Sequence, residues 1–501
     1  MNALPVPGGL NPDPPETPRK GVRVAVIGGG LAGITAAIAL AESGADVTLL
    51  EARPRLGGAT CSFSRDGLTV DTGQHIFLGC CTAYRGLLAK LGMTEHATMQ
   101  DRFDVTVLAP GGHGGDQGFA PPGVGRAPGA NGQPRKARLR RTALPGPLHM
   151  LPALGRYPFL SFAERMSVSR PALGMRFVNP ADPAVDTQRF GDWLARRGQS
   201  ERTRRALWDL FSVSALNIDG DDASLALAAV VVKTGLLGKN NAADIGVPAL
   251  PLGELHGDAG ANLLAKLGAR VALSTKVAAI EPDQGGGFRI ELAQGAQGAQ
   301  GAQGDPMTAD AVVLAVPHEK AAPLIPAGAL PEQTVAGWAG LGASPIVNVH
   351  VIYDRPVMDL PFVAAIDSPV QWVFDRTRIS GLDRPGHQYL AISLSAADQY
   401  ADTPAAQLRE QFLPALAELF PAARDANVAE FFVTRERRAT FRQAPGSGAL
   451  RPKAVTAQPG LVLAGAWTDT GWPDTMEGAV RSGLAAAVEL KASLSTIGVS
   501  K

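Results

Sequence analysis

The feature that most constrains this chain is a cluster of glycines that follows a short apolar run near the N-terminus. The run V-A-V-I at residues 24–27 is followed by Gly28, Gly30 and Gly33, in the spacing G-x-G-x-x-G. The first glycine allows a tight turn, the second lets the backbone approach a pyrophosphate, and the third lets a helix pack closely on the strand. The segment therefore predicts a strand-to-helix turn whose helix N-terminus favours phosphate groups.

The flanking sequence supplies the rest of a dinucleotide-binding βαβ unit. We expect a buried strand at 24–27, a helix at 31–41 that ends near Gly44, and a second strand at 47–50. Glu51 follows the second strand, about 20 residues after the turn, where a carboxylate can accept from both ribose hydroxyls. A carboxylate at this place would repel a 2′-phosphate, so the pattern disfavours NADP.

The next segment, R-P-R-L-G-G-A at residues 53–59, resembles the R-x-G-G element of the flavoprotein amine oxidase and phytoene desaturase superfamily. The alternative interpretation of residues 53–59 is an ordinary surface turn without a role in cofactor binding. The resemblance implies an α/β fold, with a Rossmann-type FAD-binding domain of the GR2 kind and a discontinuous α+β substrate domain. It also implies FAD as the cofactor. The FAD-binding residues that follow from it are Gly28, Gly30, Leu31, Ala32, Gly33, Glu51, Ala52, Arg53, Gly57, Gly58, Ala59, Val277, Gly465 and Met476.

Two distant segments narrow the resemblance to one branch of this superfamily. Residues 70–80 (V-D-T-G-Q-H-I-F-L-G-C) and 463–483 (which contain G-W-P-D-T-M-E-G-A-V-R-S-G) are similar to the hydroxysqualene dehydroxylases, also called squalene-associated FAD-dependent desaturases. One departure is Ala466, which stands where that family usually has an acidic residue bonded to the ribityl chain. Loss of this bond should weaken FAD binding without abolishing it. Asp469 is a candidate substitute.

The family pattern predicts how the chain divides into domains. The FAD-binding domain is expected at 21–100, 250–325 and 455–495, and the substrate-binding or lid domain at 101–249 and 326–454. Flexible insertions are expected at 109–141, which is rich in Gly and Pro, and at 294–305, which repeats G-A-Q. Residues 1–20 are Pro-rich, lack an apolar signal core and are expected to form a disordered leader.

Charge and cysteine content exclude several classes. The 47 basic and 46 acidic residues leave a formal net charge of +1, so no global attraction to nucleic acid is expected. Cys61, Cys80 and Cys81 cannot form a complete disulfide framework and lack metal-ligand spacing with histidine, so we expect a reduced cytoplasmic setting and no metal. The longest apolar run, 225–232, is far too short to span a bilayer. The protein is therefore expected to be soluble, or peripheral to the inner face of the cell membrane.

A basic cluster at residues 135–141 precedes apolar segments at 144–154 and 157–160. Positive charge beside an apolar, aromatic-bearing segment suits docking on an anionic membrane surface. A solvated loop beside a core helix explains the same pattern equally well. Between 180 and 232 the pattern becomes helical, and its apolar residues, such as Phe190, Trp193 and Trp208, are expected to be core residues first.

The resemblance to hydroxysqualene dehydroxylases implies reductive dehydroxylation of hydroxysqualene to squalene, in squalene and hopanoid biosynthesis. Hydroxide is a poor leaving group, so an acid should assist C–O cleavage. His75 is the leading candidate, because it lies in a family-like segment expected near the isoalloxazine and can titrate near neutrality. Asp469 and Asp474 are alternatives. Asp71 and Glu477 are expected to orient backbone near the flavin or to cap turns and helices.

Two other functions remain open at this point. A carotenoid or phytoene-type desaturase or isomerase would run the flavin oxidatively. A non-catalytic prenyl-lipid carrier of the same fold, like the GDP dissociation inhibitors, would not need the preserved glycines and Glu51. No nucleophile elbow with a Ser-His-Asp order is present, which argues against a hydrolase. The implied partners are a polyisoprenoid substrate, upstream prenyl-condensing enzymes and an electron-donor reductase.

Overall fold

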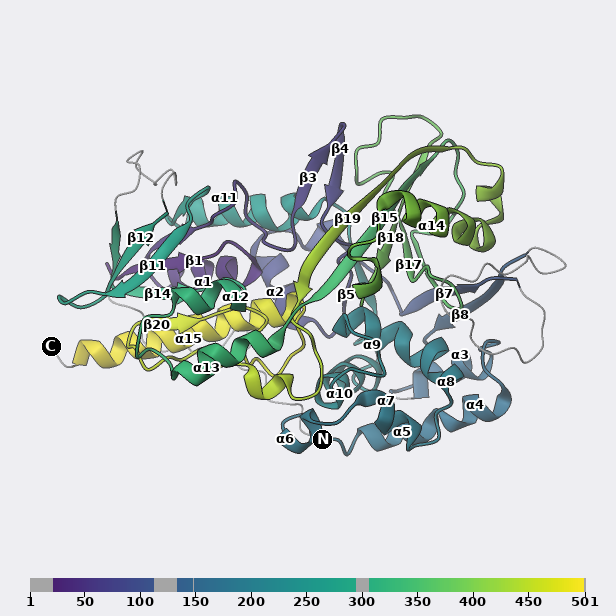
Figure 1. The fold of residues 1–501 in the computed structure, drawn as a ribbon, viewed down its shortest axis with the longest axis horizontal. Helices are drawn as coiled ribbons and strands as arrows, with labels where there is room; N and C mark the ends of the chain where they lie inside the picture. The colour runs from purple at the N-terminus through teal and green to yellow at the C-terminus, as the bar shows by residue number, and fades with distance from the viewer. Residues whose placement is uncertain (1–20, 112–132, 147, 294–305, 500–501) are drawn as a thin grey trace.

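The computed structural model describes residues 21–111, 133–146, 148–293 and 306–499. The sequence predictions for 1–20, for 112–132 within the first insertion and for 294–305 lie outside these residues. Figure 1 shows two halves side by side: one is built on a parallel sheet that contains β1 and β14, and the other on a mixed sheet that contains β15 and β18.

The first half is centred on a five-stranded, all-parallel sheet in the order β10-β2-β1-β14-β20. Its strands are β1 (Arg23–Ile27), β2 (Asp46–Leu50), β10 (Arg270–Ala272), β14 (Ala311–Leu314) and β20 (Leu461–Leu463). Most residues of these strands are apolar and buried, because other elements cover both faces of the sheet. The predicted α/β fold class is confirmed.

Helix α1 (Leu31–Ala41) covers this sheet and is buried along almost its whole length. The C-terminal helix α15 (Met476–Val499) packs against it. This contact requires Gly483, because a Cβ there would lie 2.3 Å from the carbonyl oxygen of Ala32. The helix predicted from the sequence at 31–41 is therefore present, and it shares one layer with α15.

The second half is centred on a seven-stranded mixed sheet in the order β19-β15-β18-β17-β16-β7-β8. All neighbours are antiparallel except β16 and β7, which are parallel. The strands are β7 (Asp104–Ala109), β8 (Arg135–Arg140), β15 (Ser344–Tyr353), β16 (Phe362–Ala365), β17 (Trp372–Asp375), β18 (Gln388–Leu394) and β19 (Val428–Thr440). Helix α14 (Ala405–Leu419) buries its apolar side chains against one face of this sheet.

The prediction of a flexible insertion at 109–141 is wrong for its last part, which forms strand β8. Residues 135–140 pair with β7 in antiparallel register, and they were expected to be flexible. Ala137 and Leu139 point inward and are 7% and 1% exposed, while the basic side chains between them point outward. This is the period-2 pattern of a half-buried strand, which the run of charges conceals in the sequence.

Below this sheet in Figure 1 lies a layer of short helices. They are α3 (Leu151–Gly155), α4 (Phe162–Ser167), α5 (Ser169–Met175), α6 (Pro183–Asp186), α7 (Phe190–Ala195), α8 (Glu201–Thr203), α9 (Asp209–Leu216) and α10 (Leu225–Val231), with π-helical turns at Arg204–Trp208 and Val232–Leu236. Phe190, Trp193 and Trp208 are at most 4% exposed, which confirms that they are core residues.

Smaller elements complete the fold, and some of them connect the two halves. They are β3 (Ser62–Arg65), β4 (Leu68–Asp71), β5 (Phe77–Leu78), α2 (Thr82–Lys90), β6 (Ala97–Met99), β9 (Ile245–Pro248), α11 (Ala259–Lys266), β11 (Val277–Pro282), β12 (Phe288–Leu292), β13 (Met307–Ala309), α12 (His318–Ala321) and α13 (Glu332–Gly337). Strand β9 pairs with both β5 and β6, so hydrogen bonds cross the domain boundaries predicted at 100 and 249. Leu68 and Val70 of β4 pack against Ile352 and Tyr389 of the large sheet.

Candidate functional site

The turn between β1 and α1 can be made only with glycines. Gly28 has φ +110°, and a Cβ on it would lie 2.5 Å from the carbonyl oxygen of Ala315, which follows β14. A Cβ on Gly33 would lie 1.8 Å from the carbonyl oxygen of Gly28. Both contacts are far shorter than van der Waals distances, so the first and third glycines of the motif are required by the backbone itself.

The R-x-G-G segment lies directly against this turn. Gly57 donates its amide to the carbonyl oxygen of Gly29 at 2.8 Å, and Gly30 and Gly57 form a β-bridge. A Cβ on Gly58, which has φ +58°, would lie 2.9 Å from the Cα of Gly30. No side chain caps the N-terminus of α1, and no acidic residue lies in its first turn. The free first-turn amides and the absence of Cβ atoms leave a cradle suited to a phosphate group.

Glu51 lies at the end of β2, beside the same turn. Its Oε2 accepts from the amide of Gly29 at 2.7 Å, and its Oε1 accepts from the amide of Arg53 at 2.7 Å. The amide of Thr275 donates to the Glu51 carbonyl oxygen at 2.8 Å, which ties the segment before β11 to the end of β2. The carboxylate is thus held at the sheet edge, where a nucleotide ribose binds in Rossmann folds.

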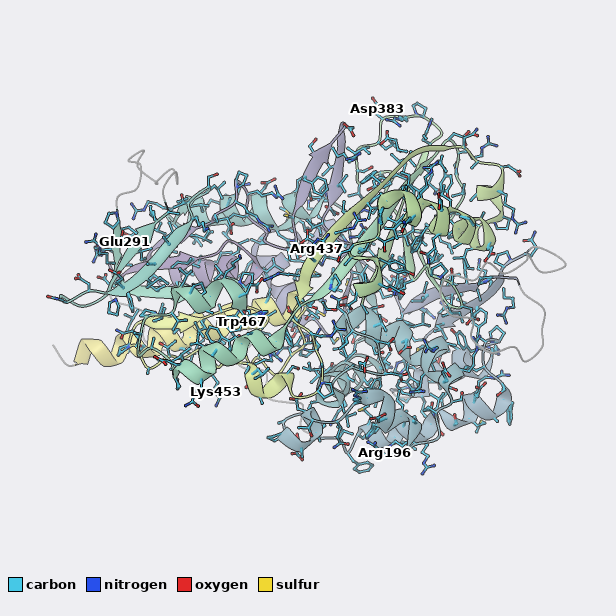
Figure 2. All side chains as sticks on the ribbon, in the orientation of Figure 1. Arg196, Glu291, Asp383, Arg437, Lys453 and Trp467 are labelled. Atoms are coloured by element: carbon cyan, nitrogen blue, oxygen red, sulfur yellow. The ribbon has the colours of Figure 1, made fainter. Side chains whose placement is uncertain are left out.

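The C-terminal segment closes the same edge of the sheet. Gly465, which follows β20, donates its amide to Ser482 Oγ of α15 at 2.8 Å. Trp467, labelled in Figure 2, donates its indole N–H to the carbonyl oxygen of Val316 at 2.9 Å. Ala466 lies 3.6 Å from the position a Cβ would take on Gly478 in the first turn of α15. Met476 is the first residue of α15.

These residues fit FAD. The ends of β1, β2, β14 and β20 meet at one edge of the parallel sheet, and a cradle without Cβ atoms, an uncapped helix N-terminus and a ribose-side carboxylate lie at that edge. The pyrophosphate would be held by the turn at 28–33, the ribose by Glu51, and the flavin by the segments around 57–59 and 465–476. The role of each predicted FAD-binding residue stays a prediction.

Fold and cradle together define a flavin-dependent oxidoreductase of the two-domain, Rossmann-type class. Residues 31–491 match the family model described as flavin containing amine oxidoreductase. The chain belongs to this family, and its cofactor is FAD.

The chain is similar along most of its length to several characterised relatives. It is 29% identical to a hydroxysqualene dehydroxylase of Rhodopseudomonas palustris and 28% identical to one of Sinorhizobium fredii, and each comparison covers 93% of this chain and 97% of the relative. It is 24% identical to the 15-cis-phytoene desaturase of Narcissus pseudonarcissus, over 93% of this chain and 79% of that protein.

Two solved structures show the same fold. A putrescine oxidase variant superimposes with a TM-score of 0.68 at 19% identity, over 94% of this chain and 99% of that one. Cyclohexylamine oxidase from Brevibacterium oxydans gives a TM-score of 0.65 at 20% identity, over 95% and 99%.

His75, the first candidate for the acid, is held in an unfavourable environment for a proton donor. Burial lowers the pKa of its imidazole, and the positive charge of Arg376 lowers it further, while the charge of Asp71 and a hydrogen bond to the Ala59 backbone oppose the shift. A lowered pKa leaves less imidazolium at neutral pH. Among the described residues, no hydrogen bond or ion pair joins His75 to Asp469 or Asp474.

The two aspartates differ sharply from each other. Asp469 is exposed, and its carboxylate accepts the amide of Gly471 at 3.3 Å, as in a local turn. Asp474 is desolvated, and this raises the pKa of its carboxyl to about 6, even though the Phe441 amide donates to it at 2.8 Å and Arg451 is nearby. Of the three candidates, Asp474 is the one whose environment favours holding a proton near neutrality.

Arg451 organises the loop that carries both aspartates, and the sequence analysis missed it. Its guanidinium donates to the carbonyl oxygens of Ala466, Thr468 and Trp472 at 3.0, 2.6 and 2.8 Å. The side chain is 8% exposed in total. A single arginine between Leu450 and Pro452 carries no sequence signal for this role, because its partners are backbone atoms of a loop that only the fold brings to it.

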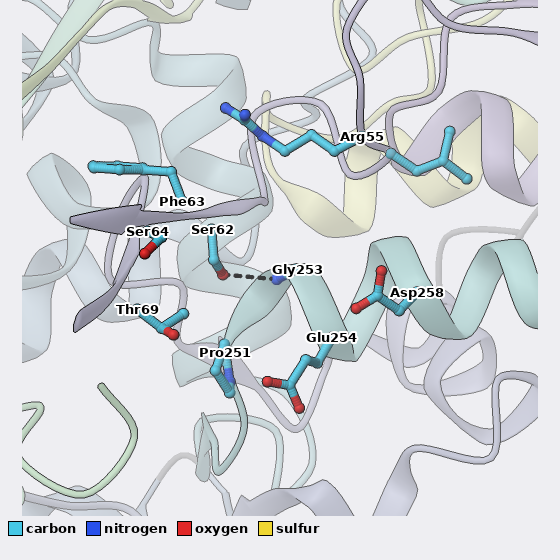
Figure 3. A pocket seen from close by; sticks show the side chains of 10 residues that line it. Arg55, Ser62, Phe63, Ser64, Thr69, Pro251, Gly253, Glu254 and Asp258 are labelled. Atoms are coloured by element: carbon cyan, nitrogen blue, oxygen red, sulfur yellow. Dashed lines mark hydrogen bonds between the residues drawn. The ribbon is translucent and has the colours of Figure 1, made fainter. Parts of the chain in front are cut away.

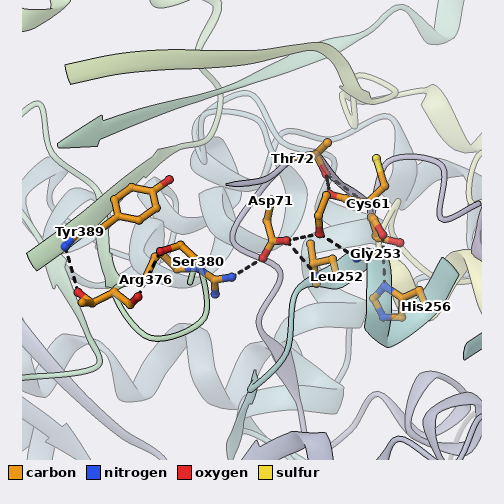
Figure 4. A network of polar contacts seen from close by, with 12 residues as sticks. Cys61, Asp71, Thr72, Leu252, Gly253, His256, Arg376, Ser380 and Tyr389 are labelled. Carbon is orange, nitrogen blue, oxygen red and sulfur yellow. Dashed lines mark hydrogen bonds and ion pairs between the residues drawn. The ribbon is translucent and has the colours of Figure 1, made fainter. Parts of the chain in front are cut away.

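Asp71 lies in a buried polar network, shown in Figure 4. Its Oδ1 accepts from Ser62 Oγ at 2.6 Å and from the amide of Leu252 at 3.0 Å, and its Oδ2 pairs with Arg376. Ser62 in turn accepts from the amide of Gly253 at 2.8 Å. Asp71 therefore holds the Leu252 amide directly and the Gly253 amide through Ser62, and it pairs with Arg376, which the sequence did not indicate.

Glu477 caps a helix, which was one of its two predicted roles. It is 1% exposed, and its carboxylate accepts the amides of Ala83 and Tyr84 at 3.2 and 2.8 Å, at the N-terminus of α2. Arg481, one turn further along α15, donates to the same carboxylate at 2.8 Å. The start of α15 is thereby tied to α2.

Figure 3 shows a shallow pocket beside the hairpin of β3 and β4. Its volume is about 240 Å³, and Arg55, Glu254 and Asp258 supply its charged groups. This is below the usual size of a ligand pocket and too polar for a long hydrocarbon. Within the described ranges, no helix is long and apolar enough to cross a membrane, and no cluster of three or more His, Cys, Asp or Glu side chains could hold a metal ion.

Proposed function

We propose that the protein catalyses FAD-dependent reductive dehydroxylation of hydroxysqualene to squalene, in squalene and hopanoid biosynthesis. The observation that carries the proposal is the near full-length similarity to two hydroxysqualene dehydroxylases, at 29% and 28% identity. The family membership and the complete phosphate cradle around Gly28 and Gly33 support it. Reduced FAD, when bound, supplies the hydride that replaces the hydroxyl group, which leaves as water.

The chain itself must then protonate the departing hydroxyl. We assign this role to Asp474 in place of His75. Its carboxyl, with a pKa raised to about 6 by burial, retains a proton to higher pH than an ordinary aspartate, whereas burial favours the neutral form of His75. The Phe441 amide and the Gln443 side chain orient Asp474, the latter by accepting its amide at 3.0 Å.

The proposal includes a cellular setting. A polyisoprenoid alcohol is held in lipid, so the enzyme would work in peripheral contact with the inner face of the cell membrane. Upstream prenyl-condensing enzymes would supply the alcohol, and a reductase would supply electrons. These partners follow from the chemistry of the proposed substrate.

A second candidate is a desaturase of the carotenoid or phytoene type, because several such enzymes match at 24% to 26% identity. It would remove hydrogen from a saturated segment and leave the flavin reduced. The non-catalytic lipid carrier is disfavoured, since a protein without flavin has no need for the cradle that Gly28, Gly33 and Glu51 form.

The test is anaerobic turnover by dithionite-reduced, FAD-loaded protein with hydroxysqualene, with the organic extract analysed by mass spectrometry. Squalene formed in step with flavin reoxidation supports the proposal. If the alcohol is unchanged and the flavin stays reduced, reductive dehydroxylation is wrong. Oxidised protein incubated with phytoene then tests the desaturase.

A further inference from the structure

The exposed apolar side chains of this protein are concentrated in one place. Ten large apolar residues of the described chain are exposed, and seven of them lie between residues 144 and 177. The most exposed are Phe162 and Met166 of α4, at 74% and 60%. Leu173 of α5 is 55% exposed, and Phe177, two residues beyond the end of α5, is 88% exposed. We call these four residues the apolar face. Figure 1 shows α4 and α5 at the outer edge of the helical layer.

The apolar face belongs to α4, α5 and the turn that follows α5, all within the described chain. Phe162 and Met166 are four residues apart within α4, so they point to one side of that helix, while Leu173 lies in α5 and Phe177 lies in the turn two residues beyond its end. Val168, Met175 and Val178 point to the opposite side and are buried in the core. The segment is thus apolar on both sides, and burial within the chain explains only one of them.

The charged residues of the segment that carries the apolar face are almost all basic. Residues 148–178 contain four arginines and one acidic residue, Glu164. Glu164 is already held by Ser161 and Ser200, through hydrogen bonds of 2.9 and 2.6 Å. In the described parts of the chain, Arg156 and Arg170 form no salt bridge, and both are exposed.

The basic cluster at residues 135–141, for which membrane docking and a solvated loop were equally open, is different. Arg138 and Arg140 pair with Asp104, Arg141 pairs with Asp244, and Arg135 pairs with Asp367. These arginines hold β8 and its surroundings in place, so most of their charge is compensated within the protein. The strand at 135–140 is therefore a poor anchor, and the surface of α4 and α5 is the better one.

We propose that the apolar face is a docking surface for an anionic lipid bilayer, with Phe162 and Phe177 inserted at the headgroup boundary and Arg156 and Arg170 against the lipid phosphates. An anionic bilayer fits both the apolar side chains and the arginines, because its hydrocarbon region accepts the former and its phosphate groups attract the latter. A second copy of this chain matches it less well, since a two-fold interface would set the arginines of one face against those of the other. The choice of lipid rests in part on the proposed polyisoprenoid substrate.

The experiment is flotation of the full-length, FAD-loaded protein with vesicles of phosphatidylcholine alone or mixed with phosphatidylglycerol. We expect binding that grows with the phosphatidylglycerol fraction and weakens with salt. The variant Phe162→Gln/Phe177→Gln should bind roughly tenfold more weakly or worse, because two exposed aromatic side chains no longer enter the bilayer. Arg156→Gln/Arg170→Gln should lose roughly tenfold on anionic vesicles and most of the salt dependence.

Matched variants on the other half of the molecule serve as controls. Val455→Gln/Val488→Gln replaces two side chains that are 51% and 43% exposed, and Lys276→Gln/Lys453→Gln removes two exposed charges. Figure 2 shows Lys453 in the half that carries α15, away from α4 and α5. Both control variants should bind like the parent.

Two outcomes would overturn the proposal: parent and apolar-face variants that bind vesicles equally, or no vesicle binding at all. If light scattering shows a dimer that Phe162→Gln/Phe177→Gln converts to a monomer, with vesicle binding unchanged, the face is a subunit interface instead. Flotation involves no turnover, so failure here leaves the dehydroxylation test untouched, and failure of that test leaves this one standing.

Discussion

Asp71, at the end of β4, and Arg376, which follows β17, form an ion pair with their side chains only 2% and 9% exposed. They are 305 positions apart in the chain and connect the nucleotide-binding half to the large mixed sheet. Asp71 also accepts hydrogen bonds from Ser62 and Leu252. One carboxylate therefore joins three segments around the candidate site, and the burial of both charges makes each dependent on the other.

Replacing Asp71 by Asn should lower the free energy of unfolding by about 3–5 kcal/mol, because Arg376 would be left buried without its counter-charge. Asp402→Asn is the control, since its ion pair with Arg437 is exposed and should contribute less than about 1 kcal/mol. Urea unfolding followed by circular dichroism measures both. Equal effects of the two substitutions would contradict the structural role of the buried pair.

Gly33→Ala should yield protein with little bound FAD. The added methyl group would lie 1.8 Å from the Gly28 carbonyl oxygen, so the turn must open and the phosphate cradle is lost. Gly155→Ala is matched in size, and nothing lies within 4 Å of its added Cβ. The ratio of flavin to protein after purification, together with the circular dichroism spectrum, separates loss of the cofactor from loss of the fold. Normal flavin content in Gly33→Ala would refute the assignment.

Asp474→Asn should reduce the turnover of hydroxysqualene by roughly 100-fold or more, because the amide cannot donate a proton to the leaving hydroxyl. With a pKa of about 6, the parent should lose activity as the pH rises above 6, and the variant should lack this limb. Asp469→Asn serves as the control and should retain turnover. Normal activity in Asp474→Asn, with activity lost in His75→Ala, would return the role to His75.

Replacing the same carboxyl should raise the stability of the protein, although it lowers its activity. Its pKa is about 6 in the folded protein and 3.8 in the unfolded chain, so the folded state binds the proton more tightly. The resulting stabilisation is complete below pH 3.8 and is lost as the pH rises through 6. Asp474→Asn should therefore unfold at a higher temperature than the parent at pH 8, with a gain in unfolding free energy of up to about 3 kcal/mol and a smaller gain at pH 5. A lower melting temperature at pH 8 would contradict the assignment.

His256 should make the fold sensitive to acid. It is fully buried and bonded through Nε2 to the Tyr84 hydroxyl at 2.8 Å, and burial lowers the pKa of its ring to about 3. The unfolded chain binds this proton near pH 6.5, so stability present above 6.5 is lost as the pH falls toward 3. At pH 5 the loss is about 2 kcal/mol relative to pH 7.5. His256→Gln should flatten this slope in urea titrations, and exposed His96→Gln should not.

The local chemistry of the nucleotide-binding edge could be predicted from the sequence. Gly28, Gly33 and Glu51 act through the turn and the strand that contain them, and the structure places them as the spacing indicated. The helix at 31–41 matches the observed bounds. Strand β8 was missed, because its outward-facing charges hid the alternation of Ala137 and Leu139.

The sequence by itself determined the βαβ unit, since short-range steric and hydrogen-bonding requirements set it, and its motifs indicated the family of the chain by resemblance. Only the tertiary structure decided which charged groups are paired and which are desolvated. Asp474 and Asp469 lie five positions apart in one loop, yet Asp474 is half-buried and accepts the amide of Phe441, whereas Asp469 is exposed. Arg376 and Arg451 acquire their roles from partners brought to them by the fold. The free energy of a charge depends on its solvent and its neighbours in space, and neither is encoded in the spacing of residues along the chain.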